Sequence, residues 1–219
     1  SIGIALSSVH GHTPEDLLKH ADTALYGVKA SGRNSIAFFE PQMQVVVSQR
    51  LQLETDLRQA LLNEEFELHY QAQLDARTQR IIGAEALLRW RHPENGLIGP
   101  ATFMHVLEDT GMILEAGHWV VRQACSFVAR LMQQGLIATD RFSISINISP
   151  RQFRQANFVA RIAAAIEEFK IPTQCLKLEI TESIMIHNIS DTVEKMNELR
   201  DMGISFAIDD FGTGYSSLS

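Results

Sequence analysis

Apolar and polar positions follow two different periods along this chain, and the change of period divides it. Near the start, two short β-type runs at 1–7 and 34–39 flank a segment whose apolar residues recur every three or four positions, as on one face of a helix. Thr13 supplies an N-cap for that helix, Pro14 takes its first position, and the helix is predicted to end near Ser31. A second helical pattern without glycine or proline follows at 43–63. We expect this second helix to join two regions of the chain.

After residue 65 the pattern predicts strands that alternate with helices. Asn147, Glu179 and Asp209 lie near the ends of the last three strands, and each interval between them holds one strand plus one helix, which implies a parallel βα series. The fold expected is α/β, an incomplete TIM-like (β/α) barrel with the first five of the eight strands that closure requires. The predicted strands lie at roughly 66–73, 81–89, 142–148, 176–181 and 204–209, and the predicted helices near 101–110, 114–135, 152–169 and 190–202.

Both ends of the sequence suggest a piece of a longer protein. The first β-type run begins at the first residue, and the chain stops at Ser219 where a loop would enter its next helix. We therefore expect residues 1–40 to close one domain, 41–64 to form a linker helix, and 65–219 to begin a second domain.

Composition and charge exclude several classes of protein. The chain has 219 residues, of which 45% are hydrophobic and 21% charged, so it is globular rather than disordered. Its net charge of −7 offers no general attraction to a nucleic acid polymer or an anionic membrane. No apolar run is long enough for a membrane helix, so we expect no membrane contact within this chain. The two cysteines stand among apolar neighbours without metal-type spacing, which favours a reducing cytoplasm.

Five oxygen-bearing side chains lie at or near the carboxyl ends of predicted strands. In a parallel barrel those ends meet at one face, where active sites are built. Carboxylates gathered there repel one another unless cations are present, and oxygen ligands suit Mg²⁺, Mn²⁺ or Ca²⁺ better than zinc. The alternative for any one of them is a solvated strand end or a helix cap. The predicted ligands of one or two divalent ions are Glu85, Asn147, Glu179, Asp209 and Asp210.

Two further side chains suit a phosphate-bearing substrate. Arg89 shares a strand face with Glu85, and its guanidinium matches phosphate oxygens in pairs, although a structural ion pair is the simpler interpretation of Arg89 alone. Gln71 lies near the end of the first predicted strand and could orient substrate or a metal-bound water. The glycine-containing stretch 211–217 follows the acidic pair as a candidate lid. Metal-assisted hydrolysis is the chemistry that these residues support best.

Several motifs resemble those of EAL-domain cyclic di-GMP phosphodiesterases. Glu85-Ala-Leu-Leu-Arg89-Trp90 is similar to the signature that names the family, and with four more motifs it occurs in the family's order over about 65–219. They are Tyr70-Gln71, Ile146-Asn147-Ile-Ser149, Leu178-Glu179-Ile-Thr181-Glu182-Ser183 and Asp209-Asp210-Phe-Gly-Thr-Gly-Tyr-Ser-Ser-Leu218.

The resemblance implies a modified TIM barrel in which two Mg²⁺ or Mn²⁺ ions activate water to linearise cyclic di-GMP to pGpG. By motif, Glu85, Asn147, Glu179 and Asp209 would ligate metal and Asp210 would serve the second ion, with Glu85, Asp209 and Asp210 as catalytic residues. Gln71 and Arg89 would contact substrate, and Glu182 would hold the loop that begins at Phe211. A homodimer through the EAL domain is compatible with this assignment.

The first forty residues resemble the closing segment of a GGDEF diguanylate cyclase domain, an α+β tail of a nucleotidyl-cyclase-like fold. The resemblance lies in Ser1-Ile-Gly-Ile-Ala5 and in 21–34. Lys29 and Arg33 would be remnants of a site for the GTP triphosphate, although basic residues at a helix end also favour the helix dipole. The domain's signature loop is absent from this chain, so we expect no cyclase activity here.

Alternatives to a phosphodiesterase stay open at this point. The family's later motifs, with a catalytic lysine, another metal-binding glutamate and a glutamine, would lie beyond Ser219, so we expect the chain alone to be inactive. A receptor that binds cyclic di-GMP without cleaving it is one alternative, and a regulatory module is another. The expected location is the cytoplasm, with any membrane anchor outside this chain.

Overall fold

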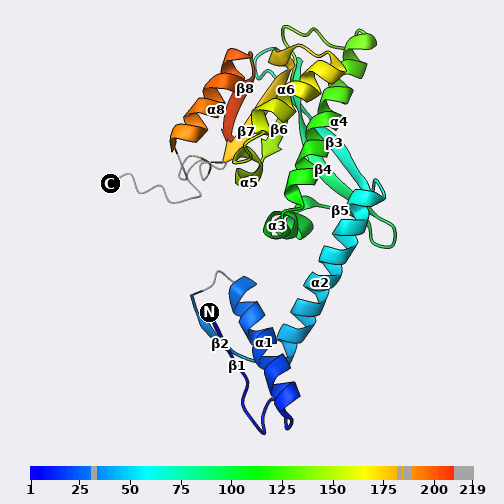
Figure 1. Cartoon of the computed structure of the whole chain (residues 1–219). Coiled ribbons are helices and arrows are strands. Elements are labelled where there is room, and N and C mark those ends of the chain that lie inside the picture. Colours follow the sequence, from blue (N-terminus) through cyan, green and yellow to red (C-terminus); the bar gives the residue numbers. More distant parts are fainter. Residues whose placement is uncertain (31–33, 182–183, 185–188, 210–219) are drawn as a thin grey trace. The chain divides into compact units, whose positions relative to one another are not determined.

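The computed structural model describes residues 1–30, 34–181, 184 and 189–209 (Figure 1). Two compact units divide the chain, Ser1–Leu57 and Arg58–Ser219. The boundary falls inside a helix, because the long helix predicted at 43–63 forms as α2, Pro41–Leu62. In the described part of the chain, no helix has both the length and the apolar character needed to cross a membrane.

The first unit is a small parallel βαβ arrangement. Strand β1 (Ile2–Ile4) pairs in parallel with β2 (Ile36–Phe38), and helix α1 (Pro14–Ala30) packs against both strands. The helix begins where Thr13 caps it, since the Thr13 Oγ1 accepts a hydrogen bond from the Asp16 backbone N–H at 3.1 Å. Both predicted strands form, but each is shorter than its β-type run in the sequence.

A six-stranded sheet forms the centre of the second unit. Its strands are β3 (Phe66–Leu74), β4 (Ile81–His92), β5 (Gly96–Ile98), β6 (Ser143–Ile148), β7 (Leu176–Thr181) and β8 (Ser205–Asp209), in the order β3-β4-β6-β7-β8 with β5 beside β4. The strands β4, β6, β7 and β8 are mutually parallel, which confirms the predicted βα series. In the described residues this sheet stays open between β3 and β8, as expected of an incomplete barrel.

The start of the sheet departs from the prediction. Strand β3 pairs with β4 in the antiparallel sense, so the first of the five predicted barrel strands does not run parallel to the others. The connection at 75–80 is a tight hairpin, and a parallel crossover needs a dozen residues or more. Strand β4 also continues beyond 89 to His92, because the turn at 93–95 returns the chain as β5, a strand that the sequence pattern did not predict.

Five helices of the described residues lie between these strands where the sequence predicts four, so one prediction was wrong. Residues 152–169 form two helices rather than one, α5 (Pro150–Phe153) and α6 (Phe158–Phe169). Phe158 begins the second helix after a turn in which its N–H donates to the Gln155 carbonyl, so no glycine or proline marks the break. The others are α3 (Pro100–Thr110), α4 (Ile113–Gln133) and α8 (Ile189–Asp201), with a short 3-10 turn at Thr173–Cys175 before β7.

The hydrophobic core lies between one face of the sheet and the helices α4, α6 and α8 (Figure 1). Alternate residues of the central strands, among them Ile144, Ile146 and Leu178, are fully buried there. Cys125 and Cys175 are free thiols inside this core, in agreement with the sequence. Because every second residue of a strand points to the core, the intervening residues of β6 and β7 are directed to the opposite face.

Candidate functional site

The predicted ligands within the described residues lie on four successive strands of one sheet. Asn147 is directly opposite Glu179 in the register of β6 and β7, and Asp209 ends β8 opposite Thr181. Asn147 lies between the buried residues Ile146 and Ile148, so its side chain faces away from the core, and Glu179 alternates with core residues in the same way. The face that carries Glu85, Asn147, Glu179 and Asp209 is called the ligand face below.

Glu85 and Asn147 are in direct contact across the first parallel strand pair. The Asn147 Nδ2 donates a hydrogen bond to the Glu85 Oε1 at 2.8 Å. The sequence predicted Glu85 at or near the end of its strand. In the structure β4 continues for seven more residues to His92. Glu85 reaches the level of the other ligands because it is in register with Ser145, two residues before Asn147.

The carboxyl group of Glu179 is affected by its acidic neighbours. Partial burial is the largest cause that raises its pKa, and the negative charges of Glu85 and Asp209 raise it further. A hydrogen bond from Ser145 and the charge of Lys177 act in the opposite direction. The charges of Glu85 and Asp209 therefore act on Glu179 across neighbouring strands of the ligand face.

The predicted substrate contacts lie on the antiparallel part of the same face. Gln71 on β3 is directly opposite Glu85 on β4, and cross-strand partners project to the same side of a sheet. Arg89 is half-buried, lies four residues along β4 on the same side as Glu85, and donates from Nη1 to the Leu88 carbonyl at 2.8 Å. Both side chains are therefore adjacent to the ligand face.

Some predicted residues cannot be placed on this face. Asp210, Glu182, Arg33 and the candidate lid at 211–217 lie outside the described residues. Lys29 is exposed in the last turn of α1, in the first unit. Its predicted role at a triphosphate stays a prediction.

Within the described ranges, no three His, Cys, Asp or Glu side chains stand close enough together to hold a metal ion. The donor chemistry of the ligand face nevertheless fits a hard divalent cation, because its members are carboxylate and amide oxygens. The charges of Glu85 and Asp209 oppose ionisation of Glu179, and a bound cation would relieve that repulsion.

A cavity of about 260 Å³ opens beside the ligand face. Asn147 and Glu179 form part of its wall, and apolar side chains from β4, α3 and α4 form most of the rest. Glu108 also lines it, and burial followed by the charge of Asp109 raises the pKa of the Glu108 carboxyl. The space next to the predicted ligands is therefore mainly apolar, with a second acidic group at its margin.

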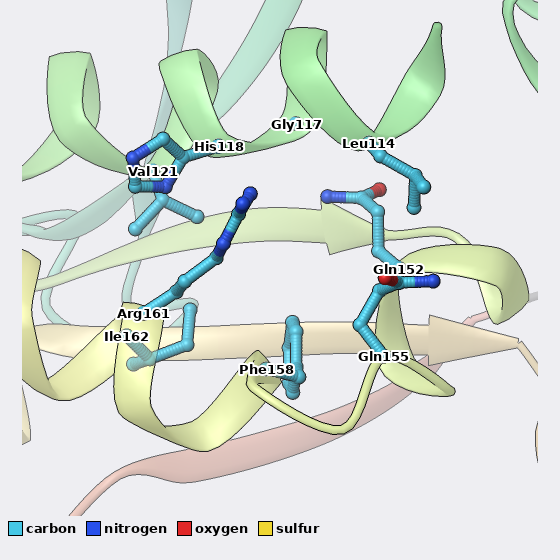
Figure 2. Close-up of a pocket in the computed structure, with 9 residues that line it drawn as sticks. All are labelled: Leu114, Gly117, His118, Val121, Gln152, Gln155, Phe158, Arg161 and Ile162. Atoms are coloured by element: carbon cyan, nitrogen blue, oxygen red, sulfur yellow. The ribbon is translucent and has the colours of Figure 1, made fainter. Parts of the chain in front are cut away.

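A second, smaller cavity lies on the helical side of the unit. Figure 2 shows the Arg161 guanidinium between the ring of His118 and the side-chain amide of Gln152, with Phe158 and Ile162 below it. Its volume of about 30 Å³ has room for only one or two water molecules, so it cannot hold a nucleotide. Desolvation, followed by the charges of Arg161 and Arg122, lowers the pKa of His118, which keeps that imidazole neutral near pH 7.

Two polar residues of the ligand face, Ser145 and Gln73, were not predicted from the sequence. Ser145 is 0% exposed on β6, and Gln73 on β3 donates from Nε2 to the Ser145 Oγ at 3.4 Å. A signal for Ser145 was present, because it lies two residues before Asn147 in a strand and so shares its face. The same signal was present for Gln73, which lies two residues after Gln71 on β3, but its contact with Ser145 depends on the order of three strands.

Comparison with known proteins identifies two families along the chain. The family described as EAL domain matches residues 54–219, and the family described as Diguanylate cyclase, GGDEF domain matches residues 1–35. These matches confirm both resemblances inferred from the motifs.

Among curated relatives, the chain is 40% identical over 219 residues to the cyclic di-GMP phosphodiesterase NbdA of Pseudomonas aeruginosa. It is 42% identical over 218 residues to the bifunctional diguanylate cyclase/cyclic di-GMP phosphodiesterase MucR of the same organism. All of this chain aligns in both cases, but it spans only 28% and 31% of the length of those proteins.

Among solved structures, one similar to this chain is the structure of the PaMucR phosphodiesterase in complex with c-di-GMP. The TM-score is 0.71 at 39% identity, covering 76% of this chain and 66% of that chain. The structure of the EAL enzyme Bd1971 bound to cAMP and cyclic di-GMP aligns with a TM-score of 0.73 at 36% identity, covering 79% of this chain and 47% of that chain. These alignments confirm the α/β fold class expected from the sequence.

Proposed function

The chain belongs to the EAL domain family, and from that premise we propose that it carries the ligand face of a metal-dependent phosphodiesterase that hydrolyses cyclic di-GMP to linear pGpG. The observation that carries the proposal is the hydrogen bond between Asn147 and Glu85. It lies on the face where the charges of Glu85 and Asp209 raise the pKa of Glu179. The names of the relatives, which include two cyclic di-GMP phosphodiesterases, support the choice of substrate.

Mg²⁺ or Mn²⁺ is the proposed cofactor, as one or two ions. Glu85, Asn147, Glu179 and Asp209 would hold it, and Asp210 would complete the set. When bound, such an ion neutralises phosphate charge and lowers the pKa of a coordinated water. In the proposed site, Glu85 keeps its carboxylate oriented through the Asn147 amide, and Asp209 places a second carboxylate at the end of β8.

The substrate is proposed to lie across the ligand face with a phosphate near Arg89. Gln71, opposite Glu85, would donate a hydrogen bond from its side-chain amide to the other side of that phosphate. The 260 Å³ cavity beside Asn147 and Glu179 offers mainly apolar walls to a base of the substrate. Glu182 is proposed to hold the loop that follows Asp210.

The domain division is likewise a proposal. We infer a GGDEF-type tail at 1–40, a linker helix at 41–64 and the EAL region at 65–219, and the family matches at 1–35 and 54–219 support it. Lys29 and Arg33 would be the remnants of a GTP site in the first part. A homodimer through the EAL region stays part of the same proposal.

The test is chromatographic detection of pGpG from cyclic di-GMP, with the protein at its natural length and with Mg²⁺ or Mn²⁺ added. Glu85→Gln should lower the rate at least about 100-fold, because it removes a charged ligand. Glu168→Gln is the matched control, since Glu168 pairs with Arg122 on the helical side, and it should keep the wild-type rate.

The other outcomes point to different functions. Binding of cyclic di-GMP without product would indicate a receptor. If neither cyclic di-GMP nor the cation changed the thermal stability of the wild-type protein, a regulatory module would be favoured.

A further inference from the structure

Ser145 is a fully buried polar residue on the ligand face. It stands on β6 in register with Glu85 of β4, and it precedes Asn147 by two residues on the same side of the strand. Its side chain is 0% exposed, although the neighbouring Asn147 is exposed. A buried hydroxyl needs hydrogen-bond partners, and within the described part of the chain no buried side-chain nitrogen or oxygen lacks one.

One partner of Ser145 comes from a strand that is not adjacent to β6. Gln73 belongs to β3, and β4 lies between β3 and β6. The residue of β4 opposite Gln73 is Gly83, which is itself opposite Ser143 of β6. A Cβ atom on Gly83 would stand 3.1 Å from the Gln73 Oε1, so the absence of a side chain lets Gln73 cross β4. Its Nε2 then reaches the Ser145 Oγ at 3.4 Å.

Glu179 of β7 lies diagonally across from Ser145 on the same face of the sheet, because Lys177 is opposite Ser145 and Glu179 is opposite Asn147. A hydrogen bond from Ser145 lowers the pKa of the Glu179 carboxyl, which makes Glu179 the second partner of Ser145. A serine hydroxyl has one proton to donate, and it accepts through its lone pairs. Because Gln73 donates to the Ser145 oxygen, the Ser145 proton remains for Glu179. The hydrogen bonds therefore run in one direction across four strands, from Gln73 through Ser145 to Glu179.

We propose that Ser145 and Gln73 are positioning residues that orient the Glu179 carboxylate to bind a divalent cation. The inference rests on the proposed function, since it requires Glu179 to be a cation ligand. Neither residue would touch the cation or the substrate. Groups that hold a metal ligand from behind set its orientation, and their loss typically weakens metal affinity about 10–100-fold.

The experiment is calorimetric titration of the metal-free protein, at its natural length, with MnCl₂. Ser145→Ala removes the hydroxyl at nearly constant volume and should weaken Mn²⁺ binding about 10-fold. Ser145→Thr keeps the hydroxyl and should restore at least half of the lost binding free energy. Ser143→Ala is the matched control, because it is the same change on the same face of β6 but away from Glu179, and it should bind Mn²⁺ as the wild type does.

Gln73→Met provides a second test at a less buried position. It keeps the length of the side chain and loses the donor, and it should weaken Mn²⁺ binding about 3-fold or more. Because Gln73 acts through Ser145, the double variant with Ser145→Ala should bind no more weakly than Ser145→Ala alone. Two changes that only destabilised the protein would have additive effects. Non-additive effects on Mn²⁺ affinity therefore distinguish positioning from a general loss of stability.

The possible results lead to distinct conclusions. Wild-type affinity in both Ser145→Ala and Gln73→Met would overturn the inference and leave the proposed function intact. A wild-type protein that binds no Mn²⁺ would overturn the proposed function and the inference together. Equal weakening by Ser143→Ala would show that the effect is not specific to Ser145 and would also overturn the inference.

Discussion

Opposing electrostatic effects meet at the carboxyl group of Glu179. Burial and two neighbouring carboxylates favour its protonated form, whereas the hydroxyl of Ser145 and the charge of Lys177 favour its ionised form. The first group of effects prevails, so the pKa of Glu179 is above its ordinary value. A ligand set of this kind costs stability when the cation is absent, and it gains affinity for a cation in return.

We expect Glu179→Gln to raise the stability of the cation-free protein at pH 7.5. A carboxyl whose folded-state pKa is raised contributes stability below its unfolded-state pKa, and that contribution is lost as the pH rises through the folded-state value. Glutamine mimics the protonated form at every pH. The variant should therefore melt about 1–3 °C above the wild type at pH 7.5, and at the same temperature as the wild type at pH 4.

The measurement is differential scanning calorimetry in EDTA at both pH values. Lys177 lies on the same strand, and Lys177→Gln should act in the opposite direction, because it removes a charge that favours ionised Glu179. A melting temperature of Glu179→Gln below that of the wild type at pH 7.5 would contradict the prediction.

At the scale of elements, the one-turn helix α5 connects the ligand face to the helices α3, α4 and α8. Ser149 and Gln152 cap it reciprocally, since each backbone N–H donates to the other's side chain. Arg151 donates to the carbonyls of Glu108 and Asp109 at the end of α3. The buried Lys195 of α8 donates to the Phe153 carbonyl at 3.2 Å. Helix α5 follows β6 directly, so these contacts fix the segment just after Asn147.

Helix α4 approaches α5 at a glycine, and this contact supplies a prediction at the same scale. A Cβ on Gly117 would collide with the side-chain amide of Gln152. Glycine to alanine inside a helix ordinarily stabilises by about 1 kcal/mol, but here the clash should reverse the sign. We expect Gly117→Ala to destabilise the second unit by about 1–3 kcal/mol.

Gly27→Ala on α1 is the control for this change. Its new methyl group would meet only the Met43 Sδ at 4.0 Å, so this variant should gain up to about 1 kcal/mol. Both variants are followed by thermal melting in circular dichroism at the helix band. Stabilisation by Gly117→Ala would mean that Gln152 moves aside without cost.

At the scale of the whole molecule, the chain consists of two compact units that meet inside α2. All the predicted cation ligands belong to the unit Arg58–Ser219. A ligand that binds only the native form of one unit stabilises that unit. We therefore expect Mn²⁺ to act on one thermal transition and to leave the other unchanged.

With Mn²⁺ at about 100 times its dissociation constant, the stabilisation is about 2.7 kcal/mol. For a unit of this size the transition should move up by about 5–10 °C. Calorimetry with and without Mn²⁺ tests this, and Glu85→Gln should abolish the shift. A shift of both transitions by the same amount would contradict the assignment of the ligands to a single unit.

Much of the organisation could be predicted because it depends on local periodicity. The helices α1 and α2, the four parallel strands and the change of pattern near residue 65 follow from apolar spacing. The predicted ligands could be recognised because they are polar residues in otherwise buried strands, where a carboxylate is costly without a partner. They are Glu85, Asn147, Glu179 and Asp209. The family was also recognisable, since its motifs are short and contiguous.

Tertiary structure alone decided the features that depend on which strands are neighbours. The short connection at 75–80 already excludes a parallel crossover, but no periodicity encodes the register in which β3 pairs with β4. The break at 154–157 has no glycine or proline to mark it. The contact between Gln73 and Ser145 needs Gly83 of a third strand between them. By itself the sequence determined which side chains have the chemistry to hold a cation. Strand order determined which of them meet, because residues far apart along the chain become neighbours only when the sheet forms.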